Sequence, residues 1–410
     1  MLYKKRVLTI FLLIILNFNI ASCSFKKDTP KEKQLNIYVD VKDKESLNIV
    51  KIITDEYKKS NSKVKLTVNN AIGGNIEEDI SKGSEQDIVI TSRNNMIKLS
   101  RKGLLNDLGS QYDENKVSEK YYRIMNAYGR FEDKYYGMSL IPFTIEILYN
   151  KSAFAKLNLT TPSTINDLRE VLKKLNDAGT RIPVILTDDI DINSGLASVV
   201  INNRVSIRKL ESMFDSGPAA YKSLTEMQQA FDTIYGLVSS GNINKNTFEI
   251  GNEVSIEKFS KGDIPLIVCS SYYSNYFKDN NIMIAADSSN DPSTKMNIPI
   301  ISNAIICTPI NGKNGEEMGN FLKFIISEEL NKKLVEKGFI TGNKKANSTI
   351  VGGAKASIVK HLENSSDDSI VYVYNIPDKL RSSITSKIDQ ILNGKHTGKE
   401  WQEAVDEAYK

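Results

Sequence analysis

Strand and helix patterns that follow one another near the start of the chain constrain its fold most strongly. Leu35–Asp40 is a short apolar strand, Ser46–Tyr57 carries an apolar helical face, and Val64–Val68 alternates like a second strand. Residues 76–105 continue the order as helix, buried strand and helix. Such units form sheets with helices on both faces, and their ligands bind beyond the carboxyl ends of the strands. The sequence therefore predicts an α/β fold.

Three loops follow the three predicted strands, namely Asp40–Lys44, Asn69–Asn75 and Thr91–Asn95. We expect them to converge at one edge of the sheet, because loops after parallel strands share an edge. The pair Gly73–Gly74 does not fit the spacing G-x-G-x-x-G, so no dinucleotide site is predicted.

The stretch Asp133–Phe154 predicts a crossing between two lobes. It turns at Gly137 and Pro142, continues through residues 144–149 as a strand rich in β-branched and aromatic residues, and then begins a helix. A further helix is predicted soon after, with Ser163 or Thr164 as its N-cap. Function is therefore expected between the lobes.

The remainder of the chain continues the α/β pattern. Up to residue 261 the predicted elements are a helix over 166–178, a strand over 182–186, a helix from Gly195, and helices over 223–238 and 250–261. A strand over 265–269 then leads into paired tyrosines, and a strand over 303–308 can return to the first lobe. The last predicted elements are one long helix over 316–336 and two helices within 379–410.

The N-terminal segment resembles a secretory signal. Lys4, Lys5 and Arg6 precede an apolar run over 7–16, which is shorter than the about 20 residues of a membrane span. Ile20–Cys23 resembles the bacterial lipobox, in which the cysteine is lipidated and becomes the mature N-terminus. We expect residues 1–22 to be a lipoprotein signal peptide and residues 23–33 to be a Lys-rich tether. An ordinary signal peptide with a chance cysteine is the alternative.

Composition excludes one class of partner and sets the number of domains. Removing residues 1–22 deletes three of the 54 basic residues and none of the 50 acidic ones, so the mature chain is nearly neutral. A neutral chain lacks the basic surface of a nucleic-acid-binding protein. The mature length exceeds what one core normally serves, so two domains are expected.

Cysteine and histidine give no sign of a metal site. Cys269 and Cys307 each lie in an apolar strand-like run, so we interpret them as buried hydrophobic residues rather than a disulfide. His361 and His396 form no ligand spacing with them. Three carboxylates in the loop 187–194 could bind calcium, but the order of ligands in an EF-hand and its closing Glu are absent. No metal and no cofactor are predicted.

Several short segments stand in an order and spacing that are specific only when taken together. They are Ser84–Ile90, Gly103–Leu108, Asp133–Gly137, Leu148–Lys151 with Phe154, Pro162–Leu168, Gly262–Leu266, and Asn375–Pro377 with the final helix over 394–408. With these segments, most of the chain after the tether resembles family 1 of the extracellular solute-binding proteins of bacterial ABC importers, the group that includes maltose-binding protein.

That resemblance implies a two-lobed fold of the periplasmic-binding-protein type II class. Each lobe is a mixed sheet flanked by helices, the ligand lies in the cleft between the lobes, and closure is a hinge motion. The expected division is 34–142 with 303–345 for lobe 1 and 143–302 with 346–410 for lobe 2. The resemblance also implies a monomer that meets the transmembrane subunits of a permease.

The cleft contacts of the family fall on loops that the pattern already places at one edge. Carried over to this sequence, the expected ligand-binding residues are Lys42, Asp43, Thr91, Ser92, Asn94, Phe143, Thr144, Asp189, Asp191, Tyr272 and Tyr273. Carboxylates and amides suit sugar hydroxyls, and an aromatic ring suits the apolar face of a sugar. Tyr272 stands where many sugar-binding relatives have a stacking Trp, although a packing role for the tyrosine pair is the alternative.

Departures from the family pattern bear on the substrate. The only Trp, Trp401, fits the amphipathic pattern of the last helix and is expected to be structural. Leu380, Ser382 and Ser383 stand where maltose-binding relatives place a further aromatic residue. A long malto-oligosaccharide is therefore disfavoured, and a smaller or more polar solute fits better.

Three functional classes are compatible with this sequence. The leading one is capture of a small carbohydrate by a lipid-anchored receptor on the extracytoplasmic face of the cell membrane. An amino-acid-derived, polyamine or anionic solute stays open. Lys42 and Arg93 would favour an anion, whereas Asp43, Asp189 and Asp191 would favour a polyol or a cation. A ligand sensor for a membrane kinase would use the same cleft. A lipid-anchored hydrolase is disfavoured, because neither G-x-S-x-G nor H-E-x-x-H occurs. A glycoside-cleaving enzyme would use Asp189 and Asp191 as its two carboxylates, and it is disfavoured because adjacent acidic residues on one loop are usually solvated.

Overall fold

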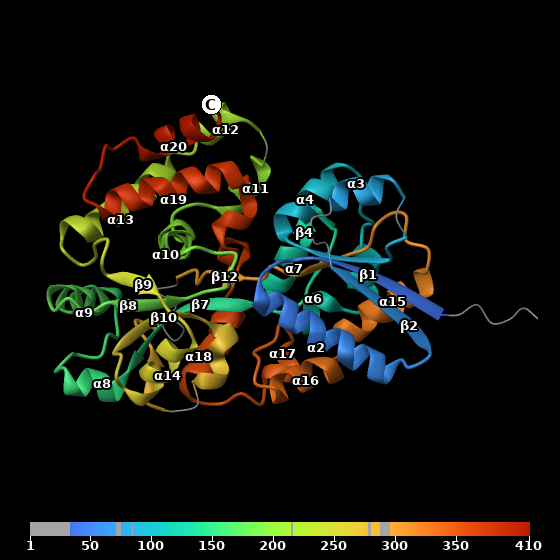
Figure 1. The fold of residues 1–410 in the computed structure, drawn as a ribbon, viewed down its shortest axis with the longest axis horizontal. Helices are drawn as coiled ribbons and strands as arrows, with labels where there is room; N and C mark the ends of the chain where they lie inside the picture. The colour runs from blue at the N-terminus through green and yellow to red at the C-terminus, as the bar shows by residue number, and fades with distance from the viewer. Residues whose placement is uncertain (1–32, 71–74, 84, 215, 278–279, 288–295) are drawn as a thin grey trace, which may run out of the picture. The chain divides into compact units, whose positions relative to one another are not determined.

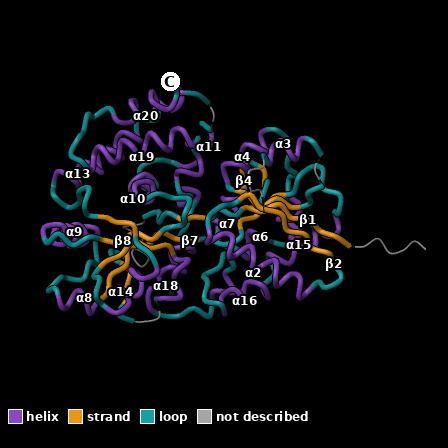
Figure 2. The backbone as a smooth tube through the Cα atoms, in the orientation of Figure 1, coloured by secondary structure: helices purple, strands orange, loops and turns teal. Residues whose placement is uncertain are grey.

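The computed structural model describes residues 33–70, 75–83, 85–214, 216–277, 280–287 and 296–410. The predictions for the signal peptide (1–22), for Cys23 and the tether to residue 32, and for Gly73–Gly74 lie outside these residues. Figures 1 and 2 show the elements described below.

The first lobe is built on a five-stranded sheet of order β2–β1–β3–β13–β6. β1 and β3 are parallel, with Ile37 opposite Ile88, whereas β13 is antiparallel to both β3 and β6. The pairing of β13 confirms that the predicted strand near residue 305 returns to the first lobe. The strands are β1 (Lys33–Asp40), β2 (Val64–Asn70), β3 (Ile88–Thr91), β6 (Met138–Ser139) and β13 (Ile305–Cys307).

Helices cover this sheet through apolar faces of helical period. In the first long helix, α2, the residues Ile49, Ile53 and Tyr57 repeat every four positions and are almost fully buried. α3 and α4 lie on the opposite side of the sheet in Figure 1. The helices are α2 (Lys44–Ser60), α3 (Ile76–Ser81), α4 (Arg93–Arg101), α5 (Gly109–Glu114), α6 (Val117–Lys120), α7 (Arg123–Gly129), α15 (Gly315–Ile325), α16 (Glu328–Glu336) and α17 (Lys344–Asn347), and a small hairpin joins β4 (Arg130–Phe131) to β5 (Lys134–Tyr135).

The single helix predicted over 316–336 is wrong, because the chain forms two helices there. Ser327 is the N-cap of α16, and its side chain accepts a hydrogen bond from the backbone N–H of Leu330. The side-chain amide of Asn331 donates to the carbonyls of Ile325 and Ser327 and to Tyr121. Side chains that bond to local backbone groups compete with the helical ladder, and here they end one helix and start the next.

The second lobe is built on a sheet of order β11–β7–β10–β8–β9, with β12 paired to β7. β7 is antiparallel to β10, β11 and β12, whereas β10, β8 and β9 are parallel neighbours. β9 lies just before a helix predicted to start at residue 250; that helix starts at Glu253 because Asn252 caps it. The strands are β7 (Phe143–Asn150), β8 (Ile182–Ile185), β9 (Phe248–Ile250), β10 (Leu266–Ser270), β11 (Ile282–Ile284) and β12 (Ile300–Ile301).

Helices flank the second sheet as well, with α10, α13 and α19 on one side and α14 and α18 on the other (Figure 1). Thr164, one of the two predicted N-caps, begins α9 and forms a reciprocal capping box with Asp167. The helices are α8 (Lys151–Lys156), α9 (Ile165–Asp177), α10 (Ile192–Ile201), α11 (Ile207–Ser212), α12 (Pro218–Lys222), α13 (Glu226–Ser239), α14 (Glu253–Lys261), α18 (Gly353–Glu363), α19 (Asp378–Leu392) and α20 (Glu400–Ala408), with 3-10 helices η1 (Ser271–Tyr276), η3 (Asp367–Ser369) and η4 (Tyr372–Asn375).

Two neighbouring segments carry the chain between the sheets, from β6 into β7 and from β12 into β13. Leu140 N donates to Ala304 O at 3.1 Å, and the hydroxyls of Ser139 and Ser302 lie 2.5 Å apart. The expected α/β architecture of two lobes, each a mixed sheet flanked by helices, is thus confirmed.

Some single-residue expectations are settled by burial. Cys269 and Cys307 are buried free thiols in β10 and β13. Trp401 is 1% exposed and its indole N–H donates to Tyr221 O at 2.7 Å, so its role is structural. Within the described ranges, no helix has both the length and the apolar character that crossing a membrane requires.

Candidate functional site

The candidate site lies where the two lobes meet, and the first lobe contributes two helix N-termini to it. β1 ends at Asp40 and leads to Asp43, the N-cap of α2, whose carboxylate accepts from Ser46 N. β3 ends at Thr91, whose hydroxyl donates to Asp40 at 3.0 Å. Ser92 caps α4 by accepting from Asn95 N. The predicted convergence of the loops after β1 and β3 is therefore present.

The second lobe contributes the loop between β8 and α10. Asp191 is the N-cap of α10 and accepts hydrogen bonds from the backbone and hydroxyl of Ser194. Asp189 accepts a hydrogen bond from the Tyr374 hydroxyl at 2.6 Å. Arg381 on α19 donates to the carbonyl of Asp189 and lies 3.6 Å from the Asp191 carboxylate. Both carboxylates are thus fixed by partners from η4, α10 and α19.

The tyrosine pair after β10 joins the two lobes. The Tyr273 hydroxyl donates to Glu45 on α2 at 2.9 Å, and the Tyr272 hydroxyl accepts from Asn48 on the same helix at 2.9 Å. Phe143, the first residue of β7, meets Tyr272 edge to face with ring centroids 5.4 Å apart. The family resemblance gave Phe143 and Tyr272 as expected ligand contacts, with packing as the alternative for the tyrosine pair, and in the structure the two rings pack against each other.

Arg93 has a different role from the anion contact that its charge suggested. Its guanidinium is fully buried and donates to the carbonyls of residues 127, 128 and 130, to Asn375 at 3.2 Å and to Glu211 on α11 at 2.6 Å. These partners occupy its donors, so the side chain holds the lobes together rather than facing a ligand. The neighbouring Asn94 donates its amide to the carbonyls of Val373 and Ile376.

Several buried polar atoms at this interface lack hydrogen bonds within the described part of the chain. Polar atoms of proteins are seldom buried without a partner, so such groups are satisfied by ordered water or by a bound polar molecule. The atoms are Asn94 Oδ1, Thr144 Oγ1, Asp189 Oδ1, Asn303 Oδ1 and Asn375 Nδ2. They come from both lobes and from the connecting segment 302–304, and we call them the interface cluster.

Three of the residues that matter here were missed by the sequence analysis. Glu45 and Asn303 do not belong to a recognisable sequence motif. Glu45 lies in the first turn of a helix, and Asn303 lies just before a strand. Asn303 donates to Asp43 at 3.1 Å. Asn375 belongs to the Asn-Ile-Pro segment that contributes to the family resemblance, and that segment was the one available signal.

The interface is rich in carboxylates. Burial raises the pKa of Asp189, the nearby Asp43 raises it further, and the hydrogen bond from Tyr374 opposes the shift. Burial also raises the pKa of Glu45, against the hydrogen bond from Tyr273. Such an arrangement favours a ligand that donates hydrogen bonds.

The predicted site residues differ in how far their side chains are exposed to solvent. Asp43, Thr91, Phe143, Thr144 and Tyr273 are buried. Ser92, Asn94, Asp189 and Tyr272 are half-buried, whereas Lys42 and Asp191 are exposed. The backbone N–H of Thr144 is held by Ser271, which leaves its hydroxyl in the interface cluster.

The loop after β8 does not gather its three carboxylates into a metal site, because Asp189 and Asp191 have separate partners. Among the described residues, one group of this kind is found elsewhere: Asp232 on α13 with His396 and Glu400. Burial would raise the pKa of Glu400, but hydrogen bonds from Thr397 N and Gln228 outweigh it and lower that pKa to about 2. Glu400 is thus already engaged in holding the start of α20.

The comparisons with known proteins agree with this architecture. The family model described as bacterial extracellular solute-binding protein matches residues 44–332. Among curated protein sequences, none matches the chain.

Solved structures of similar fold cover nearly the whole chain. The GacH receptor of Streptomyces glaucescens, solved with acarbose, is 16% identical with a TM-score of 0.63, over 92% of this chain and 97% of that one. The sugar-binding protein MalE from Xanthomonas citri is 9% identical with a TM-score of 0.67, over 92% and 96%. A solute-binding protein from Thermotoga lettingae bound with α-D-tagatose is 13% identical with a TM-score of 0.62, over 92% and 98%. At such identities the likeness concerns the fold alone.

Proposed function

Because the chain belongs to the bacterial extracellular solute-binding protein family, we propose that it binds a small carbohydrate between its lobes and delivers it to an ABC permease. The observation that carries the proposal is the interface cluster, whose unpartnered polar atoms come from both lobes. Family members and structural relatives are binding proteins, which supports a receptor rather than an enzyme.

The chemistry of the interface cluster suits a polyol. Each sugar hydroxyl both donates and accepts, so it can donate to Asp189 or Asn303 and accept from Asn375. Phe143 and Tyr272 would offer ring edges and faces to the apolar C–H surface of a pyranose or furanose. A small sugar would thereby satisfy polar atoms on both lobes at once.

Closure is the step that such contacts would drive. Tyr272 and Tyr273 of the second lobe already bond to α2 of the first. A solute that bridges the same two surfaces favours the closed arrangement, and it shifts the population only by its differential affinity for that state. The permease would recognise the closed form.

The N-terminal sequence supports an anchor on the extracytoplasmic face of the membrane. Cys23 would carry the lipid, and the Lys-rich residues after it would act as the tether to a monomeric receptor. Cys23→Ser should move the protein from the membrane fraction into the supernatant. Continued sedimentation of that variant with membranes would refute the anchor.

The decisive experiment is a thermal-shift screen of the chain from Ser24 onward against monosaccharides, disaccharides, amino acids, polyamines and simple anions. A solute at a hundredfold excess over its dissociation constant stabilises the folded state by about 2.7 kcal/mol. A shift with a small sugar, confirmed by calorimetry, supports the proposal. Shifts only with amino acids or anions would overturn the carbohydrate assignment.

A cationic solute is the second candidate, and the carboxylates favour it. Asp43 and Asp189 are close enough to interact, Glu45 interacts with Asp188, and none of the cluster atoms is cationic. A polyamine would neutralise this charge, and its affinity would fall steeply with added salt, whereas that of a sugar would not. Salt dependence of the confirmed solute therefore separates the two candidates.

A further inference from the structure

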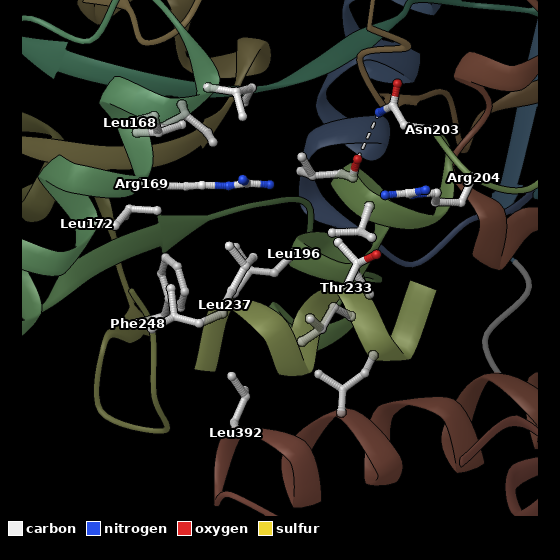
Figure 3. A pocket seen from close by; sticks show the side chains of 18 of the residues that line it. Leu168, Arg169, Leu172, Leu196, Asn203, Arg204, Thr233, Leu237, Phe248 and Leu392 are labelled. Atoms are coloured by element: carbon white, nitrogen blue, oxygen red, sulfur yellow. Dashed lines mark hydrogen bonds between the residues drawn. The ribbon is translucent and has the colours of Figure 1, made fainter. Parts of the chain in front are cut away.

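The second lobe holds an apolar cavity that is separate from the lobe interface. Its volume is about 290 Å³ and it lies among α9, α10, α13 and α19, with residues of β7 and β9 behind them (Figure 3). The walls are mainly aliphatic and include Leu168, Leu172, Leu196, Leu237, Phe248 and Leu392. We call it the lobe-2 pocket.

Most polar groups in the wall of the lobe-2 pocket are satisfied by the protein. The Thr233 hydroxyl donates to Gln229 O at 2.8 Å, within its own helix. The amide of Asn203 donates to Val199 O at 2.8 Å and to Asn297 O at 3.1 Å. These groups therefore offer little to a ligand.

Two arginines are the exception. Arg169 projects from α9 and Arg204 from the turn after α10, and their guanidinium groups point toward one another from opposite sides of the pocket (Figure 3). Neither guanidinium has an ion pair or hydrogen bond with any residue that the structure describes. Both side chains are exposed, so solvent screens their charges, but an anion placed between them would be stabilised by both.

Size and lining restrict the kind of molecule that fits. The volume is near the lower end of the range of small-molecule sites, about 300–1,000 Å³. It is about twice that of an engineered apolar cavity of about 150 Å³ that binds benzene. Guanidinium groups recognise carboxylates through paired hydrogen bonds. The occupant should therefore combine one hydrocarbon chain of moderate length with one anionic head.

We propose that the lobe-2 pocket binds a single-chain carboxylate amphiphile, of which a medium-chain fatty acid is the simplest. The chain would lie against Leu196 and Leu237, and the carboxylate would lie between Arg169 and Arg204. α10 joins this pocket to the lobe interface, because Asp191 begins the helix and Leu196 and Val200 line the cavity. The pocket is nevertheless distinct from the proposed solute site.

The test uses calorimetric titration of the chain from Ser24 onward with decanoate below its micellisation concentration. Decanol and decyltrimethylammonium have the same chain with a neutral and a cationic head. We expect decanoate to bind most tightly and the cation to show no binding. The double variant Arg169→Gln with Arg204→Gln should weaken decanoate by about tenfold or more and leave decanol unchanged.

Two further variants make the result unambiguous. Arg181→Gln removes an exposed arginine of the same lobe, which pairs with Glu249 instead of facing the pocket, and should leave decanoate binding unchanged. Val200→Phe should fill the cavity and abolish binding of both decanoate and decanol, with folding checked by thermal unfolding. The proposal would be overturned if the wild type did not bind decanoate, or if it bound decanoate, decanol and decyltrimethylammonium equally. It would also be overturned if Arg181→Gln weakened decanoate binding as much as the double variant does.

Discussion

Arg93 and Glu211 form a buried ion pair that joins α4 of the first lobe to α11 of the second, with Nη2 and Oε2 only 2.6 Å apart. The second carboxylate oxygen of Glu211 accepts from Glu132 N at 3.2 Å, so both oxygens are used. The pair therefore fixes one lobe against the other directly beside the interface cluster, because Arg93 also donates to Asn375 at 3.2 Å.

Loss of one partner of this pair should strongly destabilise the fold. Removing one member of a buried pair leaves an uncompensated charge and typically costs about 3–5 kcal/mol. We expect Arg93→Met or Glu211→Leu to lower the free energy of unfolding by that amount in urea titrations. The double variant should recover part of the loss.

An exposed pair of the same region provides the control. Lys209 and Glu226 lie 2.9 Å apart at the surface, and Lys209→Met should cost about 0–1 kcal/mol. Equal effects of Lys209→Met and Arg93→Met would contradict the stabilising role of the buried pair.

Asp189 should determine solute affinity. Asp189→Asn retains the shape of the side chain and an acceptor for Tyr374, but it removes the charge beside the interface cluster. Hydrogen bonds to charged groups contribute about 1.5–3 kcal/mol, so affinity for the solute found by screening should fall by about ten- to hundredfold. Calorimetry of Asp189→Asn against Asp188→Asn, an exposed neighbour, measures this. Equal affinities of the two variants would exclude Asp189 from the site.

His361 should make stability depend on pH. It lies buried between Glu146 at 3.0 Å and Asp287 at 3.3 Å. Burial alone would lower the pKa of His361, but the two carboxylates outweigh it and raise that pKa to about 10. Because the pKa is higher folded than unfolded, the stabilisation is complete below the unfolded pKa of about 6.5 and is lost as pH rises to about 10.

The comparison is between the wild type and His361→Gln. Urea unfolding near pH 6 should show a large loss of stability in the variant, and the difference should shrink toward about pH 10, by at most about 1.4 kcal/mol per pH unit. A difference that stays constant across this range would show that His361 is neutral in the folded protein.

Trp401 should stabilise the docking of α20. Trp401→Phe keeps a ring in the core but removes the indole donor of the Tyr221 carbonyl, which still accepts from Leu224 N at 3.0 Å, so we expect a cost of about 0.5–1.5 kcal/mol. Gln402→Ala, at an exposed position of the same helix, should change stability by less than about 0.5 kcal/mol. Thermal unfolding of the two variants tests this, and similar melting temperatures would contradict it.

Regular patterns made the architecture predictable. The apolar period of α2 and the apolar runs of β3 and β10 are local signals, and each appears in the structure close to where the sequence placed it. The break in the helix predicted over 316–336 was less visible, because the apolar period runs on through it. The break comes from the cap Ser327 and from Asn331, whose side chain bonds to the nearby carbonyls of Ile325 and Ser327.

The candidate site was predictable only in outline. Loops after strands converge for topological reasons, but the individual residues Asp43, Thr91 and Asp189 were named only through the family resemblance. The partners of Arg93 lie far away in the sequence, at residues 127–130, 211 and 375, so its internal role depends on the tertiary fold. Charge alone therefore suggested an anion contact where the structure has an ion pair.

The position of β13 has a consequence for how the chain is made. β13 lies between β3 and β6, yet it follows the whole second sheet in the sequence. The sheet of the first lobe therefore cannot be completed until Cys307 has been synthesised. Pairings between such distant segments form slowly, because the intervening chain must first be ordered.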